Sequence, residues 1–540
     1  MHQWHAVSSY LAMGKWSRRK TPDTLAPYFK HGFWGQHKIL SGMLLALIGA
    51  LYGFAFGVTA TYFLVQMMIP MALVAILLVV LLPENAVTFE RSITTLYFSF
   101  FLVLAVWPDY LALSLGALPW ITATRLIAIP ITLLFLVSLS QSEAYRHKLM
   151  RQLACAAPVW KCLLVYFVIS FVTIAASDTP VQSVNKFIVA IYAWGVMFLV
   201  GVQTFAKPER VRPFAQILWV GLLFACAIGL WEFMLGKVVW ADQIPSFLKV
   251  DDEAVAAILS GSMRAAIGEH RVQGKFTTPL GFAEFLALVT PFILHFVVHG
   301  RTLLERAAAA LTLPLILLVI YTTDSRLGTI GFLLASFGYL FFWMFRRFRR
   351  DRNSLFAPLI ILVYPALMLV LLVSSFFFTR LRNAVWGGGA YVASNDARST
   401  QMEKGLELVL QQPWGHGIGQ AAETLGFTNQ VGRLTIDTYY ISIALESGVI
   451  GFFAYYGAFL AAMWIGAWKL IDAGDQEETS WLLPTLLSLG NYLVIKSIFS
   501  QQDNHPLAFA FLGLGVALIF QVKSTVPTTA SKSETRLQAI

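Results

Sequence analysis

Residues 437–468 read DTYYISIALESGVIGFFAYYGAFLAAMWIGAW, and only Asp437 and Glu446 in this stretch carry a charged side chain. A helix of about 20 apolar residues crosses the hydrocarbon core of a bilayer, because lipid offers backbone polar groups no partner outside the helix. The stretch therefore predicts a membrane-spanning helix, long enough to tilt strongly or to project beyond the bilayer. This signal decides the fold class.

Similar apolar runs recur along the whole chain. Of its 540 residues, 57% are hydrophobic and 13% are charged, and the mean hydropathy is +0.68. Soluble domains carry about 25% charged residues, so the composition excludes an ordinary soluble protein. We expect about fourteen spans. They lie near residues 39–58, 62–82, 92–107, 119–139, 158–176, 186–206, 213–235, 279–299, 307–322, 327–346, 355–377, 437–468, 481–500 and 506–521. The predicted fold class is all-α, a polytopic integral membrane protein whose large loop contains short helices.

Basic residues fall on one side of these spans, and the positive-inside rule places that side in the cytoplasm. They include Lys15, Arg18, residues 146–151, Arg210, Arg212, Arg301, Arg306 and Arg346. The predicted organisation is a basic cytoplasmic tail (1–38), a bundle of about eleven spans (39–377) with a periplasmic insert (236–278), a large periplasmic loop (378–436), about three further spans (437–521) and a disordered cytoplasmic tail (522–540). Because the surplus of positive charge serves membrane insertion, nucleic acid is not an expected partner.

Both periplasmic inserts contain helix signals. DDEAVAAILSGSMRAAIG at 251–268 has apolar residues at helical spacing and predicts a helix in the membrane interface. In the second insert, Thr400 and Glu403 have the spacing of a capping box, which predicts a helix that Pro413 stops. This places Arg398 just before a helix N-terminus, where unpaired N–H groups favour an anion.

Three arginines lie at predicted external membrane boundaries: Arg271, Arg326 and Arg398. A guanidinium group keeps its charge at any relevant pH and matches phosphate oxygens in a bidentate manner. We interpret the three as a binding site for a lipid-linked diphosphate. The alternative is that each arginine extends to the interface or pairs with an acid such as Asp324 or Asp396.

Asp437 and His416 are the two candidates for a general base that takes a proton from a sugar hydroxyl. Partial burial at the membrane surface would raise the pKa of Asp437 toward the useful range. The alternatives are that Asp437 caps the helix it precedes, and that His416, between glycines, caps or stacks.

Tyr439, Tyr440 and Trp414 are candidates for stacking on sugar faces, against the alternative of an interfacial aromatic belt. Glu446 lies inside an apolar span and needs a partner or a cavity, for which Arg125 and Lys496 are candidates. The histidines do not cluster at ligand spacing, so neither a metal nor another cofactor is expected.

The order of these motifs resembles a known family. The chain contains, in this order, R-x-x-G-x-F-x-x-P at 271–279, D-S-R at 324–326, Arg398 before P-W-G-H-G-I-G at 413–419, and D-T-Y-Y at 437–440 with a downstream E-S-G-V-I-G. This order of motifs is similar to that of the superfamily of O-antigen ligases and of O-antigen and exopolysaccharide polymerases. The resemblance extends from about residue 210 to 470. It implies that a glycan is transferred from an undecaprenyl-diphosphate carrier to an acceptor glycan, without metal, at the periplasmic face of a bacterial inner membrane. It also implies that Arg271, Arg326 and Arg398 match the family's essential arginines, and that the anomeric carbon is inverted.

One position departs from the ligase pattern. Ligases of this superfamily have a histidine, typically followed by asparagine, where Asp437 and Thr438 stand here. The resemblance therefore favours a polymerase, whose acceptor is another lipid-linked repeat unit and for which a chain-length regulator is a candidate partner. A ligase that transfers the glycan to lipid A core is the alternative. A lipid-linked sugar transporter or flippase, and a metal-dependent transferase using a polyprenyl monophosphate sugar, are alternatives of other classes.

Overall fold

The computed structural model describes residues 88–114, 120–250, 252–264, 269–350, 355–378, 392–428, 434–472 and 480–525, with isolated positions between 42 and 84 and at 382 and 432. The chain divides into two compact units, Met1–Val87 with Leu139–Glu143, and Thr88–Ser138 with Ala144–Ile540. The second unit is described below. The predicted tail at 1–38 lies outside the described residues, as do the predicted spans at 39–58 and 62–82 except for isolated positions.

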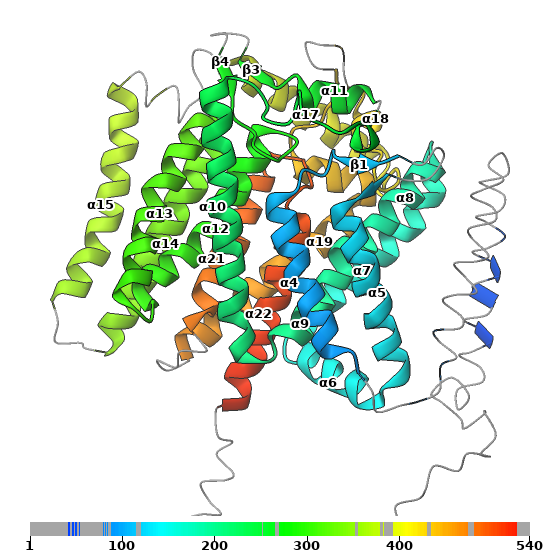
Figure 1. Ribbon diagram of the computed structural model, residues 1–540, viewed down its shortest axis with the longest axis horizontal. Helices are drawn as coiled ribbons and strands as arrows, with labels where there is room; N and C mark the ends of the chain where they lie inside the picture. Colours follow the sequence, from blue (N-terminus) through cyan, green and yellow to red (C-terminus); the bar gives the residue numbers. More distant parts are fainter. Residues whose placement is uncertain are drawn as a thin grey trace, which may run out of the picture. The chain divides into compact units, whose positions relative to one another are not determined.

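Helices form nearly all of the described chain (Figure 1). Up to residue 235 they are α4 (Glu90–Val106), α5 (Ala123–Gln141), α6 (Glu143–Ala154), α7 (Ala157–Val172), α8 (Pro180–Ala190), the π-helical turn η2 (Ile191–Val196), α9 (Met197–Phe205) and α10 (Val211–Leu235). Short 3-10 turns lie at Thr173–Ala176, Pro208–Arg210 and Ser246–Leu248. A two-stranded antiparallel hairpin, β1 (Ala112–Leu113) with β2 (Ile121–Thr122), joins α4 to α5.

The remaining helices are α11 (Glu253–Leu259), α12 (Pro279–His299), α13 (Leu303–Thr322), α14 (Arg326–Arg350), α15 (Phe356–Phe377), α17 (Val392–Gln411), α18 (Ala421–Leu425), α19 (Tyr439–Asp472), α21 (Leu482–Lys496) and α22 (His505–Thr525). A second hairpin pairs β3 (Ser262–Arg264) with β4 (Glu269–Arg271). Every span predicted from residue 92 onward coincides with a helix. Nine helices of the described residues are long and apolar enough to cross a membrane, so the all-α polytopic class is confirmed.

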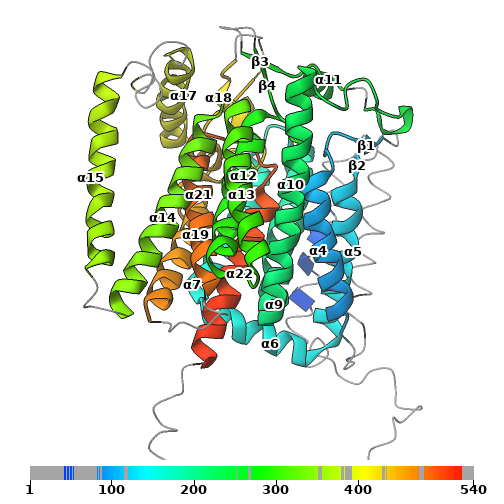
Figure 2. The same ribbon diagram turned by 60° about the vertical axis from the view of Figure 1, so that its left-hand side comes forward.

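α12 and α22 are the central helices of the unit. In their most apolar stretches 83% and 94% of the residues are buried, against 28% for α5 and α13. α12 packs against α13, α14 and α21, α22 packs along α9, and α7 packs along α19. α15 stands at the edge of the bundle beside α14 (Figure 2). Most of the other spans thus keep an apolar face outside the core, as helices surrounded by lipid do.

One end of the bundle, at the top of Figure 1, carries the long connections. There α10, α13 and α15 end, α12, α14, α19 and α22 begin, and the connections contain the β3–β4 hairpin, α11, α17 and α18. We call this end the loop end. Capping fixes where α12 starts: the Thr278 hydroxyl accepts from Gly281 N at 3.2 Å, and Pro279 supplies a helical φ in the first turn.

The helix predicted along 251–268 is only half present. Asp252 caps α11 by accepting from Ala254 N at 2.8 Å, but the helix ends at Leu259. Gly261 follows with a φ of 80°, and the chain turns into β3. The prediction is therefore wrong from Ser260 to Arg264, because Gly261 takes a left-handed conformation that helical periodicity does not reveal. Residues 265–268 lie outside the described part of the chain.

The helix start predicted at Thr400 is also wrong. α17 begins at Val392, so Arg398 lies inside the helix and not before its N-terminus. The Thr400 hydroxyl does not cap the helix; it donates to Asp396 O, four residues earlier, at 2.9 Å. A threonine in a helix interior commonly makes this bond, which is why the capping-box spacing misled.

An ion pair lies wholly inside the bundle. Lys496 Nζ, at the end of α21, is 2.9 Å from Glu284 Oε1 on α12, and neither side chain is exposed. Asn504 donates to the same carboxylate at 3.0 Å. Lys496 was a candidate partner for Glu446, and the structure gives it Glu284 instead. Lys186, on α8, is the cation that interacts with Glu446.

Candidate functional site

Arg271 is held against the turn between α13 and α14. Its Nε donates to Thr323 O at 3.2 Å, and its Nη2 lies 3.4 Å from Asp324 O. The next residue, Val272, donates its N–H to Thr322 O at 3.2 Å. The end of the β3–β4 hairpin and the end of α13 are thus joined by main-chain and side-chain bonds, and the Arg271 guanidinium is fixed next to the first turn of α14.

A buried carboxylate at the end of α10 organises the same loop. Glu232 accepts from Gly274 N at 2.6 Å and from Gln273 N at 3.1 Å, and its Oε1 lies 2.8 Å from His270 Nε2. Its side chain is fully buried. Sequence reasoning missed Glu232, although a lone acid near the end of an apolar span was a signal for it.

Arg326 opens α14 after a strained turn. Asp324 has a φ of 50°, in the left-handed region, and the Ser325 hydroxyl accepts from Gly328 N at 3.2 Å. This bond makes Ser325 the N-cap of α14. Arg326 Nη2 lies 3.4 Å from Asn395 Oδ1 on α17. The first residue of α14 therefore reaches across to the helix that carries Arg398.

One face of α17 presents three polar residues at spacings of three: Asn395, Arg398 and Gln401. Residues three apart lie on the same side of a helix. Asn395 accepts from Arg326, Arg398 faces Asp437, and Gln401 Oε1 accepts from Asp437 N at 2.8 Å. This face joins the start of α14 to the segment before α19.

Arg398 and Asp437 form the charged centre of this arrangement. Arg398 Nε is 3.8 Å from Asp437 Oδ2, with 23% of the Arg398 side chain and 33% of the Asp437 side chain exposed. Burial raises the pKa of Asp437, and the guanidinium of Arg398 opposes part of the rise. Burial lowers the pKa of Arg398; the carboxylate acts against this shift and the charge of Arg326 acts with it. Two guanidinium groups thus lie close enough to repel, and an anion between them would relieve that repulsion.

The Arg398 guanidinium also has unused hydrogen-bonding capacity. Its Nε is buried and makes no hydrogen bond to any described residue. A buried donor without an acceptor costs about 1–3 kcal/mol, so such a group needs an explanation. A ligand oxygen at this position would supply the missing acceptor.

Asp437 is not the cap of α19. The helix begins at Tyr439, and the Thr438 hydroxyl lies 3.4 Å from Ile441 N in the N-cap position. The Asp437 carboxylate is therefore left to face Arg398. This placement disfavours the capping alternative for Asp437.

The P-W-G-H-G-I-G loop docks into a break in α19. Gly448, inside the helix, has a φ of 66° and a ψ of −173°, which frees backbone groups on both sides. Val449 N donates to Pro413 O at 3.0 Å, His416 N donates to Leu445 O at 2.8 Å, and Gly417 N donates to Glu446 O at 3.1 Å. The loop thereby satisfies groups that the broken helix leaves unpaired.

His416 belongs to this docked loop. Its ring Nδ1 lies 3.1 Å from Leu445 O, so the ring as well as the main chain contacts the broken helix. Leu445 is eight residues beyond Asp437, about 12 Å along a helix axis. The structure brings together Arg326, Arg398 and Asp437, it fixes Arg271 on the turn before α14, and it places His416 at the break of α19.

The three aromatic candidates have different surroundings. Tyr439 has no exposed surface and packs edge-on against Tyr455 and His505, so it is a core residue and cannot stack on a glycan in this structure. Tyr440 is partly exposed and donates its hydroxyl to Leu493 O at 2.9 Å. Trp414 is 71% exposed beside the break in α19. Trp414 and Tyr440 stay candidates for glycan binding.

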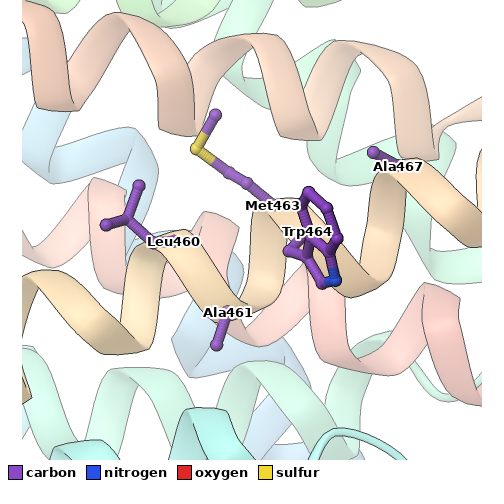
Figure 3. A pocket seen from close by; sticks show the side chains of 5 residues that line it. All are labelled: Leu460, Ala461, Met463, Trp464 and Ala467. Carbon is purple, nitrogen blue, oxygen red and sulfur yellow. The ribbon is translucent and has the colours of Figure 1, made fainter.

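A hollow of about 550 Å³ lies elsewhere, on α19. Figure 3 shows Met463 and Trp464 next to each other on this helix, with Leu460, Ala461 and Ala467. Its lining offers no titratable group and lies within a predicted span. Such a surface suits contact with lipid and not the chemistry of a glycan. Among the described residues, no group of three or more His, Cys, Asp or Glu side chains could hold a metal ion.

Comparison with known families identifies the segment that carries most of this site. Residues 310–456 match the family model described as O-antigen ligase. This segment is similar to O-antigen ligases. The matched segment includes Arg326, Arg398 and Asp437, whereas Arg271 precedes it. No curated protein matches the sequence.

The match over residues 310–456 confirms the resemblance inferred from the motifs. The nine long apolar helices of the described residues indicate a multi-pass membrane protein. The family match is consistent with a function of the ligase or polymerase type. It leaves the acceptor and the donor to be inferred from the site.

Proposed function

We propose that this protein polymerises oligosaccharide repeat units linked to undecaprenyl diphosphate into a surface polysaccharide. The observation that carries the proposal is the pairing of Arg398 with Asp437 at 3.8 Å, with Arg326 beside them and Arg271 fixed on the adjoining turn. The guanidinium groups can bind an anion, and the partly exposed carboxylate of Asp437 beside them can accept a proton.

In the proposed reaction, Arg271, Arg326 and Arg398 hold the diphosphate of the donor. The acceptor hydroxyl loses its proton to Asp437 while its oxygen forms a bond to the anomeric carbon of the donor sugar. The bond between that carbon and the phosphate oxygen breaks, and undecaprenyl diphosphate leaves with the electron pair. Fixed guanidinium groups stabilise the charge that develops on the leaving phosphate. Attack from the face opposite the leaving group inverts the anomeric carbon.

Asp437 is the preferred base over His416 for a geometric reason. Asp437 faces Arg398, which would hold the leaving group. His416 instead contacts Leu445, which lies about two helical turns further along the chain than Asp437. Burial raises the pKa of Asp437, which makes its carboxylate a better proton acceptor than an exposed aspartate.

The charge pattern supports a periplasmic site in a bacterial inner membrane. Arg326 begins α14, and Arg346, Arg347 and Arg349 lie near its other end, a full span away. The positive-inside rule assigns the end with Arg346 to the cytoplasm, and therefore the loop end to the periplasm. A substrate anchored in the membrane by a lipid can reach a site at this surface by diffusing along the membrane.

Transfer to lipid A core by a ligase is the second candidate, favoured by the description of the matched family. The aspartate at 437, where the motif comparison expects histidine in a ligase, favours the polymerase. Deletion of the gene in the native host separates the two. A single repeat unit on its acceptor indicates a lost polymerase, whereas long chains accumulating on the carrier lipid indicate a lost ligase. The reaction itself is tested by adding purified lipid-diphosphate-linked repeat units to the reconstituted protein; no chain growth or transfer would reject both.

A further inference from the structure

A cavity of about 260 Å³ with charged side chains in its wall lies at the loop end, apart from the arginine cluster. Its wall is formed where α4 ends and α5 begins, by α8 and η2, and by the start of α22. The lining residues that matter here are Asp109, Trp120, Arg125, Lys186, Tyr192 and Asp503. None of them takes part in the transfer step proposed above.

The charged groups of the wall are fixed in position. Asp109 Oδ1 accepts from the Thr124 hydroxyl at 2.9 Å, and Asp503 Oδ2 accepts from the Thr277 hydroxyl at 2.6 Å. Arg125 Nη1 donates to Trp120 O at 2.7 Å. The buried Lys275 interacts with both Asp109 and Asp503. The cavity therefore presents preset acceptors and donors within one small space.

Aromatic side chains form another part of the wall. Trp120, Tyr192 and Trp194 line the cavity, and the last two belong to the π-helical turn η2. Trp194 is nearly buried and stacks on Phe509, with ring centroids 5.6 Å apart. A π-helical turn inside a helix frequently marks a functional site, because it redirects side chains that a regular helix would place elsewhere.

Two loops connect this cavity to the arginine cluster. The Ser500 hydroxyl donates to Ile436 O, directly before Asp437, and Asp503 is three residues further along the chain. Three residues span at most about 11 Å. Lys275, which interacts with both wall carboxylates, is likewise four residues from Arg271. The wall of the cavity at Asp503 is therefore within a short reach of the segment that carries Asp437.

The wall chemistry selects among ligands. The wall alternates carboxylates with cations, Asp109 and Asp503 with Arg125 and Lys186, so it lacks the uniformly positive lining that selects a phosphate. An acyl or isoprenoid chain would leave these charged groups without polar partners. Sugar hydroxyls both donate to carboxylates and accept from arginine and lysine, and a sugar ring can lie on an aromatic face. The volume is below the range of about 300–1,000 Å³ typical for drug-sized ligands, so it suits one sugar residue and not an oligosaccharide.

We propose that this cavity binds one sugar residue of the acceptor glycan, next to the residue whose hydroxyl is glycosylated. The proposal rests on the transfer reaction inferred above and assigns the acceptor to the cavity bounded by α5, α8 and the start of α22. It makes Asp109 and Arg125 determinants of acceptor recognition, with no role in holding the diphosphate.

The test uses the full-length protein in detergent and two substitutions, Asp109→Asn and Arg125→Gln. Asp178→Asn and Lys237→Gln, at exposed positions of the loop end, are matched controls. The probe is the oligosaccharide repeat unit released from its carrier lipid by mild acid. Saturation-transfer NMR reports binding of this probe. The transfer assay uses a carrier-linked oligomer of several repeat units as donor and a single carrier-linked unit as acceptor, so that a separate KM is measured for each.

We expect the wild-type protein and both controls to transfer saturation to the probe, and each cavity variant to lose most of this signal. The acceptor KM should rise about tenfold or more in the cavity variants, as expected for a lost hydrogen bond to a charged group, while the donor KM stays at its wild-type value. Thermal unfolding of the same samples checks that the variants are folded.

The outcomes separate this proposal from the proposed function. If the wild-type protein binds the probe through the cavity but transfers nothing, the reaction is rejected and the sugar site stands. Transfer with unchanged acceptor KM and unchanged probe binding in folded Asp109→Asn and Arg125→Gln variants would overturn the site and leave the reaction intact. Absence of probe binding to the wild-type protein would overturn it as well.

Discussion

Arg398 Nε lies 3.8 Å from Asp437 Oδ2. Arg398 belongs to α17, and Asp437 lies two residues before the start of α19. The Asp437 main chain is held by Gln401, one helical turn beyond Arg398 on the same face of α17. The contact therefore depends on how α17 packs on α19. That packing is close: a Cβ at Gly405 of α17 would lie 2.4 Å from Ile441 Cγ2.

Replacing Arg398 by alanine should reduce transfer about 10²–10³-fold, because a fixed donor to the developing phosphate charge is lost. Incorporation of labelled lipid-linked repeat units into polymer measures this effect. Lys404→Ala, at an exposed position of the same helix, is the control and should leave transfer unchanged. An Arg398→Ala protein that is folded and fully active would remove Arg398 from the mechanism.

Replacing Asp437 by asparagine should abolish most transfer, since an amide cannot accept the proton. Burial raises the pKa of Asp437, so in the wild-type protein the acid limb of kcat/KM should lie above the ordinary range of an aspartate. The sign follows from the base role: activity falls as the pH drops through this pKa, because the carboxyl becomes protonated. A pH profile of initial rates measures the limb.

The residual activity of Asp437→Asn should lack that acid limb. Asp396→Asn, an exposed carboxylate on α17, should retain both the rate and the limb of the wild-type protein. An unchanged pH profile in Asp437→Asn would assign the proton transfer to another group, with His416 as the next candidate.

Replacing Gly448 by alanine should destabilise the protein. Its φ of 66° costs a non-glycine residue about 1–3 kcal/mol, and the added Cβ would lie 2.2 Å from Pro413 O. The docked loop would have to leave the break in α19. Thermal unfolding in detergent should show a lower Tm. Gly457→Ala, in a regular part of α19 where the Cβ meets Cys162 Sγ at 3.5 Å, should have little effect; equal Tm values for the two variants would contradict the role of the break.

Replacing Glu232 by glutamine should weaken donor binding through Arg271. Glu232 accepts from two backbone N–H groups of the loop that follows Arg271, and hydrogen bonds to a charged acceptor contribute about 1.5–3 kcal/mol each. We expect the donor KM to rise about tenfold, with a smaller change in the acceptor KM. Asp242→Asn, exposed in the same insert, should change neither. A uniform fall in kcat alone would indicate a merely structural role.

The helices were accessible from the sequence because membrane insertion imposes a strong constraint on composition. Each predicted span from residue 92 onward has its helix, since a backbone in lipid has almost no other way to satisfy its polar groups. The C-terminal end of α11 and the start of α17 differ from the prediction. They lie in the inserts, where short-range signals such as the Thr400 spacing compete with tertiary contacts.

For the site, the sequence supplied the residue types and their order. Arg271, Arg326 and Arg398 stand out because guanidinium groups at external membrane boundaries match phosphate oxygens, and Asp437 because a carboxylate at the start of the long helix can act as a base. It could not show that Tyr439 is buried or that Glu232 organises the loop after Arg271. These facts depend on which side chains meet across helices far apart in the chain.

The sequence by itself determined that the chain is a multi-pass helical membrane protein with cationic residues between its spans. That information is local, because hydropathy and charge act on each segment independently of the others. Only the tertiary structure decided that Arg398 meets Asp437 beside Arg326, and that the loop with His416 fills a break in α19. Those contacts join segments distant in sequence, and their geometry is set by helix packing and by the need to pair buried polar groups.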